Sequence, residues 1–376
     1  MKKLFLIFLW LVLGACASKP TIGKLLWESA NRNISDDLFL ITPYFPNPNS
    51  DPQNVYLSNL NGEIMRTWKI RGPLQNSKLG PKGWVYSLRL APFESRLTFA
   101  GGECTELVAV DENNVERLNL QAKVFSHDFD FVGDDKIAIF RLQRIGPKEL
   151  RKFVPKTKKE FAYTDIISVL DFSGTELWSW HLSDHVAEIE HSQINDDNSS
   201  LSNSNSIKYI ESNPITKKPA FLVSIRNLDV VTMVEYPSGK IIWQTPPNNF
   251  SRQHDAILNG QQVILFNNNL FSEAPTFEIL AFDIFTRKRT LLWSPSRLTP
   301  QTTVFAGGFQ ILSNGNYLIS NSMSGQLIEL NPSGQMLWSY LVGPSQGNRI
   351  NWLLGIGFFR AEVYTQAKYK EFLKGK

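Results

Sequence analysis

Two histidine–aspartate pairs stand at corresponding places in the sequence, each at the start of an apolar run that a turn divides. His127 and Asp128 open HDFDFVGDDKIAIF, and His254 and Asp255 open HDAILNGQQVILF. An imidazole titrates near pH 6.5, so it keeps a lone pair at neutral pH that can act as a nucleophile. A histidine that caps a strand end is the alternative. The residue types alone leave both interpretations open, and the fold has to decide between them.

The remaining histidines cluster in one short stretch. They are separated by intervals of four and six residues and occupy His181, His185 and His191. These intervals fit no standard spacing of zinc ligands, so we interpret the three as loop residues. The sequence therefore predicts no metal site, and it indicates no cofactor.

A repeat organises residues 51–365. Its unit is an apolar strand, a turn that usually contains glycine, and a strand that ends in tryptophan. The copies read VYLSNLNGEIMRTW, SVLDFSGTELWSW, MVEYPSGKIIW, LAFDIFTRKRTLLW, LIELNPSGQMLW and the degenerate LVAVDENNVERLNL. Successive marker positions lie 45 to 65 residues apart, at Trp68, Leu118, Trp178, Trp243, Trp293 and Trp338. Such separations are typical of propeller blades, which are roughly 40–50 residues long before insertions.

A second hairpin lies between the markers and completes the unit. It recurs as HDFDFVGDDKIAIF, HDAILNGQQVILF and FQILSNGNYLIS, each with Asp, Asn or Gly at its turn. Two hairpins make a four-stranded blade, so the sequence predicts an all-β, six-bladed β-propeller of four-stranded blades. We expect the tryptophans to pack between blades. A short helix is expected only in the tail, within residues 364–376.

The predicted propeller brings distant residues together. Inner strands line the central channel, and all of them begin at the same end of the ring. His127 and His254 both open inner strands, so we expect their side chains to converge there.

The N-terminus carries a targeting signal. Two lysines precede an apolar run at residues 4–13 that is too short to span a bilayer, and this run ends in LGAC. The pattern resembles a bacterial lipobox, which implies a signal peptide of residues 1–15 and a lipid on the thiol of Cys16. An ordinary signal peptide or a short anchor is the alternative.

The residues after the cysteine suggest a destination. Ala17 and Ser18 include no aspartate, which in lipoproteins of Gram-negative bacteria implies the outer membrane, with the body in the periplasm. Residues 16–50 would be a tether and lead-in, and residues 366–376 a tail. With Cys16 lipidated, Cys104 is the only other cysteine, so no disulfide can form within the chain.

The charge pattern argues against nucleic acid as a partner. The formal net charge of the 376 residues is +4, and the basic residues are scattered except at residues 147–160, which we expect to form a solvated loop. The 42% apolar composition is that of a globular protein with a full core.

The motifs form an ordered series that resembles a known family. They include VYLSNLNGEIMRTW, HDFDF, LVSIRNLDVV, SGKIIW, QHDAILNGQQVILFNN, GGFQILSNGNYLISNS and FFRAEVY, across about residues 52–365. The series resembles bacterial arylsulfotransferases that work without a nucleotide sulfate donor. The resemblance implies transfer of a sulfuryl group from a phenolic sulfate ester to an acceptor phenol through a sulfohistidine.

The resemblance assigns roles to three residues. His254 in QHD matches the family's nucleophile, and His127 matches a histidine that contacts the sulfuryl group. Arg226 in LVSIRN matches the family's arginine. Preorganised cationic donors of this kind would stabilise the sulfuryl oxygens in the transition state.

The match is incomplete at a second motif. Asn205 and Ser206 match the family's H-x-N-S-I motif, but Asn203 stands where that motif has histidine, and asparagine carries no charge. We predict Asn203, Asn205 and Asp255 as substrate-binding residues. Asp255 could instead orient the ring of His254, or have no such role. The hairpin after His254 is also two residues shorter than is usual in the family.

Two other kinds of protein would fit the repeat. One is a non-catalytic outer-membrane propeller lipoprotein that acts as a binding or assembly scaffold. The other is a sugar- or quinone-binding propeller. The enzyme hypothesis predicts small phenolic partners and a membrane contact through the lipid on Cys16, and the sequence names no protein partner.

Overall fold

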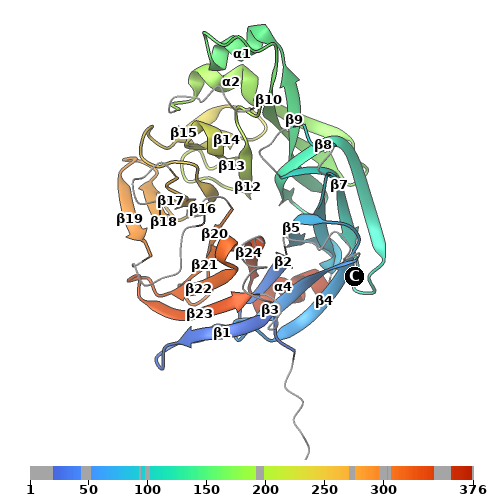
Figure 1. Cartoon of the computed structure of the whole chain (residues 1–376), viewed down its shortest axis with the longest axis vertical. Helices are drawn as coiled ribbons and strands as arrows, with labels where there is room; N and C mark the ends of the chain where they lie inside the picture. The colour runs from blue at the N-terminus through green and yellow to red at the C-terminus, as the bar shows by residue number, and fades with distance from the viewer. Residues whose placement is uncertain are drawn as a thin grey trace, which may run out of the picture.

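Strands dominate the part of the chain that the structure describes. A computed structural model describes residues 20–43, 52–92, 95–97, 102–191, 199–270, 276–295, 303, 306–342 and 357–374. The strands close a ring around a central axis in a propeller-like arrangement (Figure 1). The all-β class is thus confirmed. The predicted signal peptide at residues 1–15 and the predicted lipidation site Cys16 lie outside the described residues.

The strands form five antiparallel sheets. One sheet joins β24 (Phe358–Tyr364) to β2 (Leu38–Pro43), β3 (Gln53–Asn59) and β4 (Ile64–Ile70). The largest contains β5 (Leu74–Leu79), β6 (Val85–Leu90), β7 (Glu103–Val110), β8 (Glu116–Val132), β9 (Lys136–Ile145), β10 (Ala162–Asp171) and β11 (Glu176–His181).

The other three sheets follow in chain order. The first contains β12 (Ser204–Ile210), β13 (Ala220–Ile225), β14 (Val230–Glu235) and β15 (Ile241–Gln244). The second contains β16 (His254–Asn259), β17 (Gln262–Asn267), β18 (Glu278–Asp283) and β19 (Arg289–Trp293). The third contains β20 (Gly308–Ile311), β21 (Tyr317–Asn321), β22 (Gln326–Leu330), β23 (Met336–Val342) and β1 (Gly23–Glu28).

The prediction of six separate four-stranded blades is wrong. Only three of the five sheets that the described residues form have four strands. The physical reason is β8, a single 17-residue strand that pairs first with β7 and then with β9, so that one seven-stranded sheet stands where the sequence suggested two blades. No glycine or proline interrupts β8, and the strand therefore continues through the expected boundary.

Both ends of the described chain help to close the ring. The late strand β24 pairs with the early strand β2, and β1 pairs with β23, where Glu28 faces Trp338. Segments more than 300 residues apart in sequence are thereby hydrogen-bonded to each other.

The marker tryptophans pack as expected. The six marker positions fall on β4, β8, β11, β15, β19 and β23. Trp68 and Trp338 are fully buried, and the ring of Trp178 on β11 lies 5.7 Å from the ring of Phe221 on β13 of the neighbouring sheet. The tryptophans thus contribute to the apolar packing of the ring.

Helices are few in the described ranges. The expected terminal helix forms as α4 (Gln366–Lys374), and α2 (Leu182–His185) is a single turn. The stretch expected to be a loop at 147–160 instead contains α1 (Pro147–Phe153), which begins with proline and buries Leu150 and Phe153. No helix within the described ranges is long and apolar enough to cross a membrane.

The burial of Trp68 leads to a test of the packing. Trp68→Ala should lower the free energy of unfolding by about 3–5 kcal/mol, because it opens a cavity against fully buried neighbours. The midpoint of urea unfolding measures this change. Leu291→Ala, at a half-exposed site on β19, is the control and should change stability by less than about 0.5 kcal/mol. Equal midpoints for the two variants would contradict the packing role.

Candidate functional site

The innermost strands bring His127 and His254 to one place. Strands β5, β8, β12, β16, β20 and β24 contact one another in turn around the axis (Figure 1). His127 lies on β8 and His254 begins β16, and both imidazole rings approach the ring of Phe359, with centroids 6.5 and 6.2 Å away. The expected convergence of the two histidines is therefore confirmed.

The backbone is irregular where these side chains originate. His127, Asn203 and Asp255 have positive φ angles of 47°, 49° and 44°, and the strand register shifts near each of them. A positive φ is uncommon for residues other than glycine, and such strain clusters at functional sites. Bulges of this kind turn side chains to new directions beside active sites. The strained backbone is a signal of function that the sequence does not display.

The ring of His254 is held at both nitrogens. Its Nδ1 lies 2.6 Å from Oδ1 of Asn268, and its Nε2 accepts the backbone N–H of Ala306 at 3.1 Å. A nitrogen that accepts an N–H carries a lone pair, so the proton of the neutral ring is on Nδ1. The side chain is buried, with 4% of the residue exposed.

The ring of His127 is confined on one side by a glycine. Its Nδ1 lies 2.7 Å from Oγ of Ser126. A Cβ atom at Gly102, where φ is +74°, would come within 2.4 Å of the imidazole Nε2. Only glycine allows this close approach, and so Gly102 determines where the His127 ring can lie.

Both imidazoles are neutral near pH 7. Burial, followed by the positive charge of Arg226, lowers the pKa of His127 to about 4. Burial and Arg226 also hold the pKa of His254 well below 6.5, although the hydrogen bond to Asn268 acts in the opposite direction. The same guanidinium thus lowers the pKa of both histidines.

Two arginines meet beside the histidines. Arg226, at the start of a 3-10 turn after β13, donates to Oδ1 of Asn227 at 3.0 Å, and Arg252 donates to the same oxygen at 2.7 Å. Burial and the charge of Arg252 lower the pKa of Arg226 to about 10, whereas Asp229 opposes this shift. Two clustered guanidinium groups suit a bound anion. Arg252 stands two residues before His254 but was not among the site residues predicted from the sequence.

The predicted substrate-binding asparagines differ in their surroundings. Asn203 is buried, and its amide makes no hydrogen bond to the part of the chain that the structure describes. Asn205 donates to the carbonyl of Gln253 at 2.8 Å, while its own Oδ1 is buried with no partner among the described residues. Ser206 accepts the N–H of Ala256 at 3.2 Å. The motif therefore joins β12 to β16, and substrate binding by these asparagines stays a prediction.

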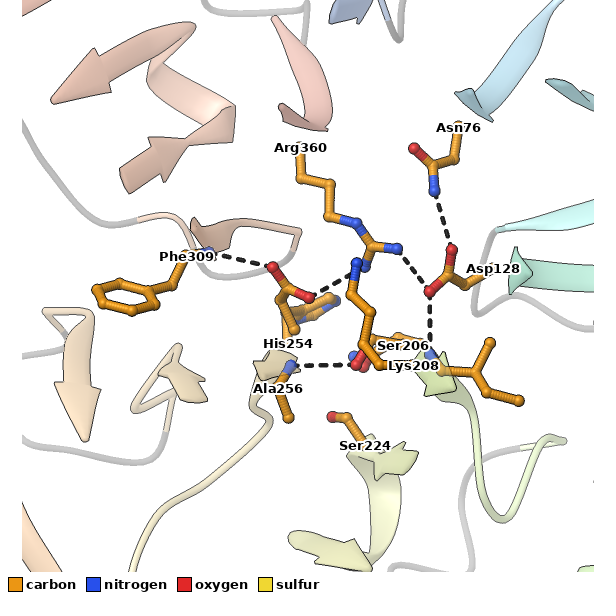
Figure 2. Close-up of polar contacts among 12 residues, drawn as sticks. Asn76, Asp128, Ser206, Lys208, Ser224, His254, Ala256, Phe309 and Arg360 are labelled. Carbon is orange, nitrogen blue, oxygen red and sulfur yellow. Dashed lines mark hydrogen bonds and ion pairs between the residues drawn. The ribbon is translucent and has the colours of Figure 1, made fainter. Parts of the chain in front are cut away.

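The two aspartates that follow the histidines bind a buried arginine. Asp128 lies 2.5 Å and Asp255 lies 3.5 Å from guanidinium nitrogens of Arg360 on β24 (Figure 2). Asp128 also accepts the N–H of Ile207 on β12, and Asp255 accepts the N–H of Phe309 on β20. The His254 ring is thus hydrogen-bonded by Asn268, whereas the contacts of Asp255 with Arg360 and Phe309 join inner strands. Substrate binding by Asp255 stays a prediction.

Further charges surround Arg360. Its Nε donates to Glu362 at 2.8 Å, Glu362 pairs with Lys208 at 3.2 Å, and Lys78 pairs with Asp128 at 3.3 Å. Burial alone would raise the pKa of Asp128, but the positive charges of Arg360 and Lys78 outweigh it and lower the pKa. The signal in the sequence was a single arginine within the apolar strand FFRAEVY.

The other histidines lie away from this site. The prediction that they are loop residues is wrong for His181, which ends β11, and for His185, which ends α2. His181 bonds Gln143, and His185 stacks on Trp180 with 4.8 Å between ring centroids. No cluster of three metal-ligating side chains occurs within the described ranges. Cys104 is buried, as is common for a free cysteine, which packs as a small apolar residue.

The ion pair between Asp128 and Arg360 can be tested by stability. Asp128→Asn should lower the free energy of unfolding by about 3 kcal/mol at about pH 7, because it leaves part of a buried charge uncompensated. The pKa of Asp128 is lowered in the folded protein, so its stabilisation is complete above the ordinary value of 3.8 and is lost as the pH falls below it. Urea unfolding measures both effects.

The matched control is Asp135→Asn, at a carboxylate whose side chain is 71% exposed. It should leave stability within about 0.5 kcal/mol of the parent protein. An Asp128→Asn variant as stable as this control at about pH 7 would contradict a structural role for the pair.

Comparisons with known proteins add a family and a fold. A family model described as Arylsulfotransferase (ASST) matches residues 106–343, more than half of the chain. This span includes His127, Arg226 and His254. No curated protein matches the chain.

Three solved structures are similar to the chain at low sequence identity. A protein of unknown function from Bacteroides caccae has 10% identity and a TM-score of 0.51, with 87% of this chain and 98% of that chain covered. AztD from Citrobacter koseri has 10% identity and a TM-score of 0.44, with 88% and 98% covered. TolB from Acinetobacter baumannii has 10% identity and a TM-score of 0.47, with 83% and 64% covered. Only the first has a TM-score above 0.5 and supports a common fold, and at 10% identity none bears on function.

Proposed function

The chain belongs to the arylsulfotransferase family, and from that premise we propose that it moves a sulfuryl group from a phenolic sulfate ester to an acceptor phenol. His254 is the proposed nucleophile, and the intermediate is a sulfohistidine. The observation that carries the proposal is a buried, neutral imidazole with its lone pair on Nε2, in the field of the Arg226 guanidinium.

The first proposed step uses this lone pair. Nε2 of His254 attacks sulfur, a nitrogen–sulfur bond forms, and the sulfur–oxygen bond of the ester breaks with its electron pair on the departing phenolate. Arg226 and Arg252 supply positive charge to the sulfuryl oxygens, and a neutral His127 can donate an N–H to them. In the second step the acceptor gives its phenolic proton to water and attacks sulfur as the phenolate, and the nitrogen–sulfur bond breaks with its electron pair returning to Nε2.

The Ala306 amide has to move for this chemistry. It donates to Nε2 in the structure, so sulfur can bond to that nitrogen only after the hydrogen bond has opened. Ala306 has a φ of 62°, an uncommon conformation for a residue with a side chain. Moving a residue with a strained backbone costs less conformational free energy than moving a relaxed one, because the shift can relieve the strain.

Two observations support a second candidate function. A non-catalytic scaffold would be consistent with the uncharged Asn203 and with an Nε2 lone pair already occupied by the Ala306 amide. The activity test below separates the two candidates.

Replacing the nucleophile should abolish transfer. With 4-nitrophenyl sulfate as donor and phenol as acceptor, His254→Ala should release no nitrophenol above background, because no sulfohistidine can form. Arg226→Gln should lower kcat about 10²–10³-fold through loss of one charged donor. His185→Ala, a surface histidine outside the site, should retain full activity. Equal turnover by His254→Ala and the parent protein would refute the proposed nucleophile, and an inactive parent protein would favour the scaffold.

We also propose that a lipid on Cys16 anchors the protein in the outer membrane with its body in the periplasm. The support is the LGAC sequence after a short apolar run. Cells fed radiolabelled palmitate should label the parent protein but not Cys16→Ser, and the variant should leave the membrane fraction. Cys104→Ser, at the buried cysteine, is the control. Label that persists in Cys16→Ser would contradict the anchor.

A further inference from the structure

Asn268 is the residue that holds the ring of His254. It follows β17, has only 1% of its surface exposed, and directs its Oδ1 at His254 Nδ1, 2.6 Å away. Its Nδ2 donates to two backbone carbonyls, those of Thr303 at 2.7 Å and Ala306 at 2.9 Å. Every polar atom of this side chain therefore has a partner.

These contacts fix the orientation of the amide. Backbone carbonyls only accept hydrogen bonds, so the NH₂ group must face Thr303 and Ala306. The amide oxygen is then left to face His254, and because it only accepts, the imidazole must carry its proton on Nδ1. The N–H that Ala306 donates to Nε2 requires the same tautomer independently.

We propose that Asn268 is a positioning residue for sulfuryl transfer, which keeps the proton of His254 on Nδ1 and thereby makes Nε2 the attacking nitrogen. The proposal rests on the function proposed above. Histidines that act in catalysis commonly depend on a group that orients the second ring nitrogen. Here that group is a neutral amide instead of a carboxylate.

The neutral amide suits an anionic substrate. A carboxylate at this position would repel the sulfate ester and would favour the imidazolium, which has no free lone pair. It would also lack the two N–H donors that bind the carbonyls of Thr303 and Ala306. Asn268 thus holds both the nucleophile and the residue whose amide covers it.

The hydrogen bond should strengthen as the reaction proceeds. When Nε2 bonds to sulfur, the ring gains positive charge while its proton stays on Nδ1, so the bond to Asn268 Oδ1 becomes charge-assisted. When the acceptor phenol removes the sulfuryl group, the lone pair returns to Nε2 and the ring is neutral again. An interaction that strengthens in the transition state affects kcat more than KM.

The test combines ¹⁵N NMR of histidine-labelled protein with kinetics on 4-nitrophenyl sulfate and phenol. In the parent protein the His254 signals should show a protonated Nδ1 and an unprotonated Nε2. Asn268→Ala should lose this preference and lower kcat about 10–10²-fold, with KM within about twofold. Asn268→Asp keeps the size of the side chain and should move the acid limb of the rate to higher pH, because a carboxylate stabilises the imidazolium.

Asn267 provides a matched control. It is an adjacent buried asparagine whose amide binds Ser251 and Glu278. Asn267→Ala should keep the tautomer and the pH profile of the parent protein, so a loss of stability common to both variants cannot imitate a positioning effect.

The outcomes separate this proposal from the proposed function. An Nε2–H tautomer in the parent protein, or an Asn268→Asp variant with an unmoved acid limb, would overturn the role of Asn268. A parent protein that has the Nδ1–H tautomer but transfers no sulfuryl group would overturn the proposed function. If Asn268→Ala then lost the preference for this tautomer, the result would still support the role of Asn268 in positioning the ring.

Discussion

The centre of the ring depends on one buried charge, the guanidinium of Arg360. A charge removed from water is costly unless carboxylates compensate for it, and here they come from three inner strands. Asp128 on β8 pairs with Arg360 (Figure 2), and Asp255 on β16 and Glu362 on β24 pair with it as well. The C-terminal strand is thereby tied to strands from the middle of the chain, and the ring cannot shift at this end without separating the charges.

The same constraint places the histidines. Each aspartate that serves Arg360 directly follows a histidine, and the bulged backbone at this point turns the two neighbouring side chains in different directions. His127 and His254 are thus carried to a common site by residues whose own contacts are structural. Burial and the charge of Arg226 keep both histidines neutral, and the neighbouring guanidinium groups of Arg226 and Arg252 suit an anion. In each His–Asp pair, the aspartate pairs with Arg360 and stabilises the ring of strands, and the histidine lies in the candidate site.

Much of this arrangement could be predicted from the sequence. The tryptophan repeat predicted strands and a propeller-like ring, and the equivalent positions of His127 and His254 predicted their convergence. These inferences depend on local periodicity, which a sequence displays directly. The prediction of six four-stranded blades was wrong because β8 continues from one predicted blade into the next. The sequence of the hairpins contains nothing that requires this strand to break.

The missed residues share a physical cause. Asn268 acts on His254 from 14 positions away, and the Ala306 amide acts from 52 positions away, through contacts that only the closed ring creates. Asp255, for which the sequence left open substrate binding, orientation of the His254 ring or no such role, pairs with Arg360, more than 100 positions later in the chain. The spacing of residues along the sequence does not predict contacts between positions this far apart. The available signal was the pair of charged residues in an otherwise apolar strand, Arg360 and Glu362 in FFRAEVY.

The central claim is that His254 carries the sulfuryl group between donor and acceptor. Mass spectrometry of the protein, quenched at alkaline pH after brief exposure to 4-nitrophenyl sulfate without acceptor, tests it most directly. The account predicts a mass increase of one sulfuryl group, located on the peptide that contains His254 and lost when phenol is added. A sulfuryl group on any other residue, or nitrophenol release with no covalent adduct, would contradict it.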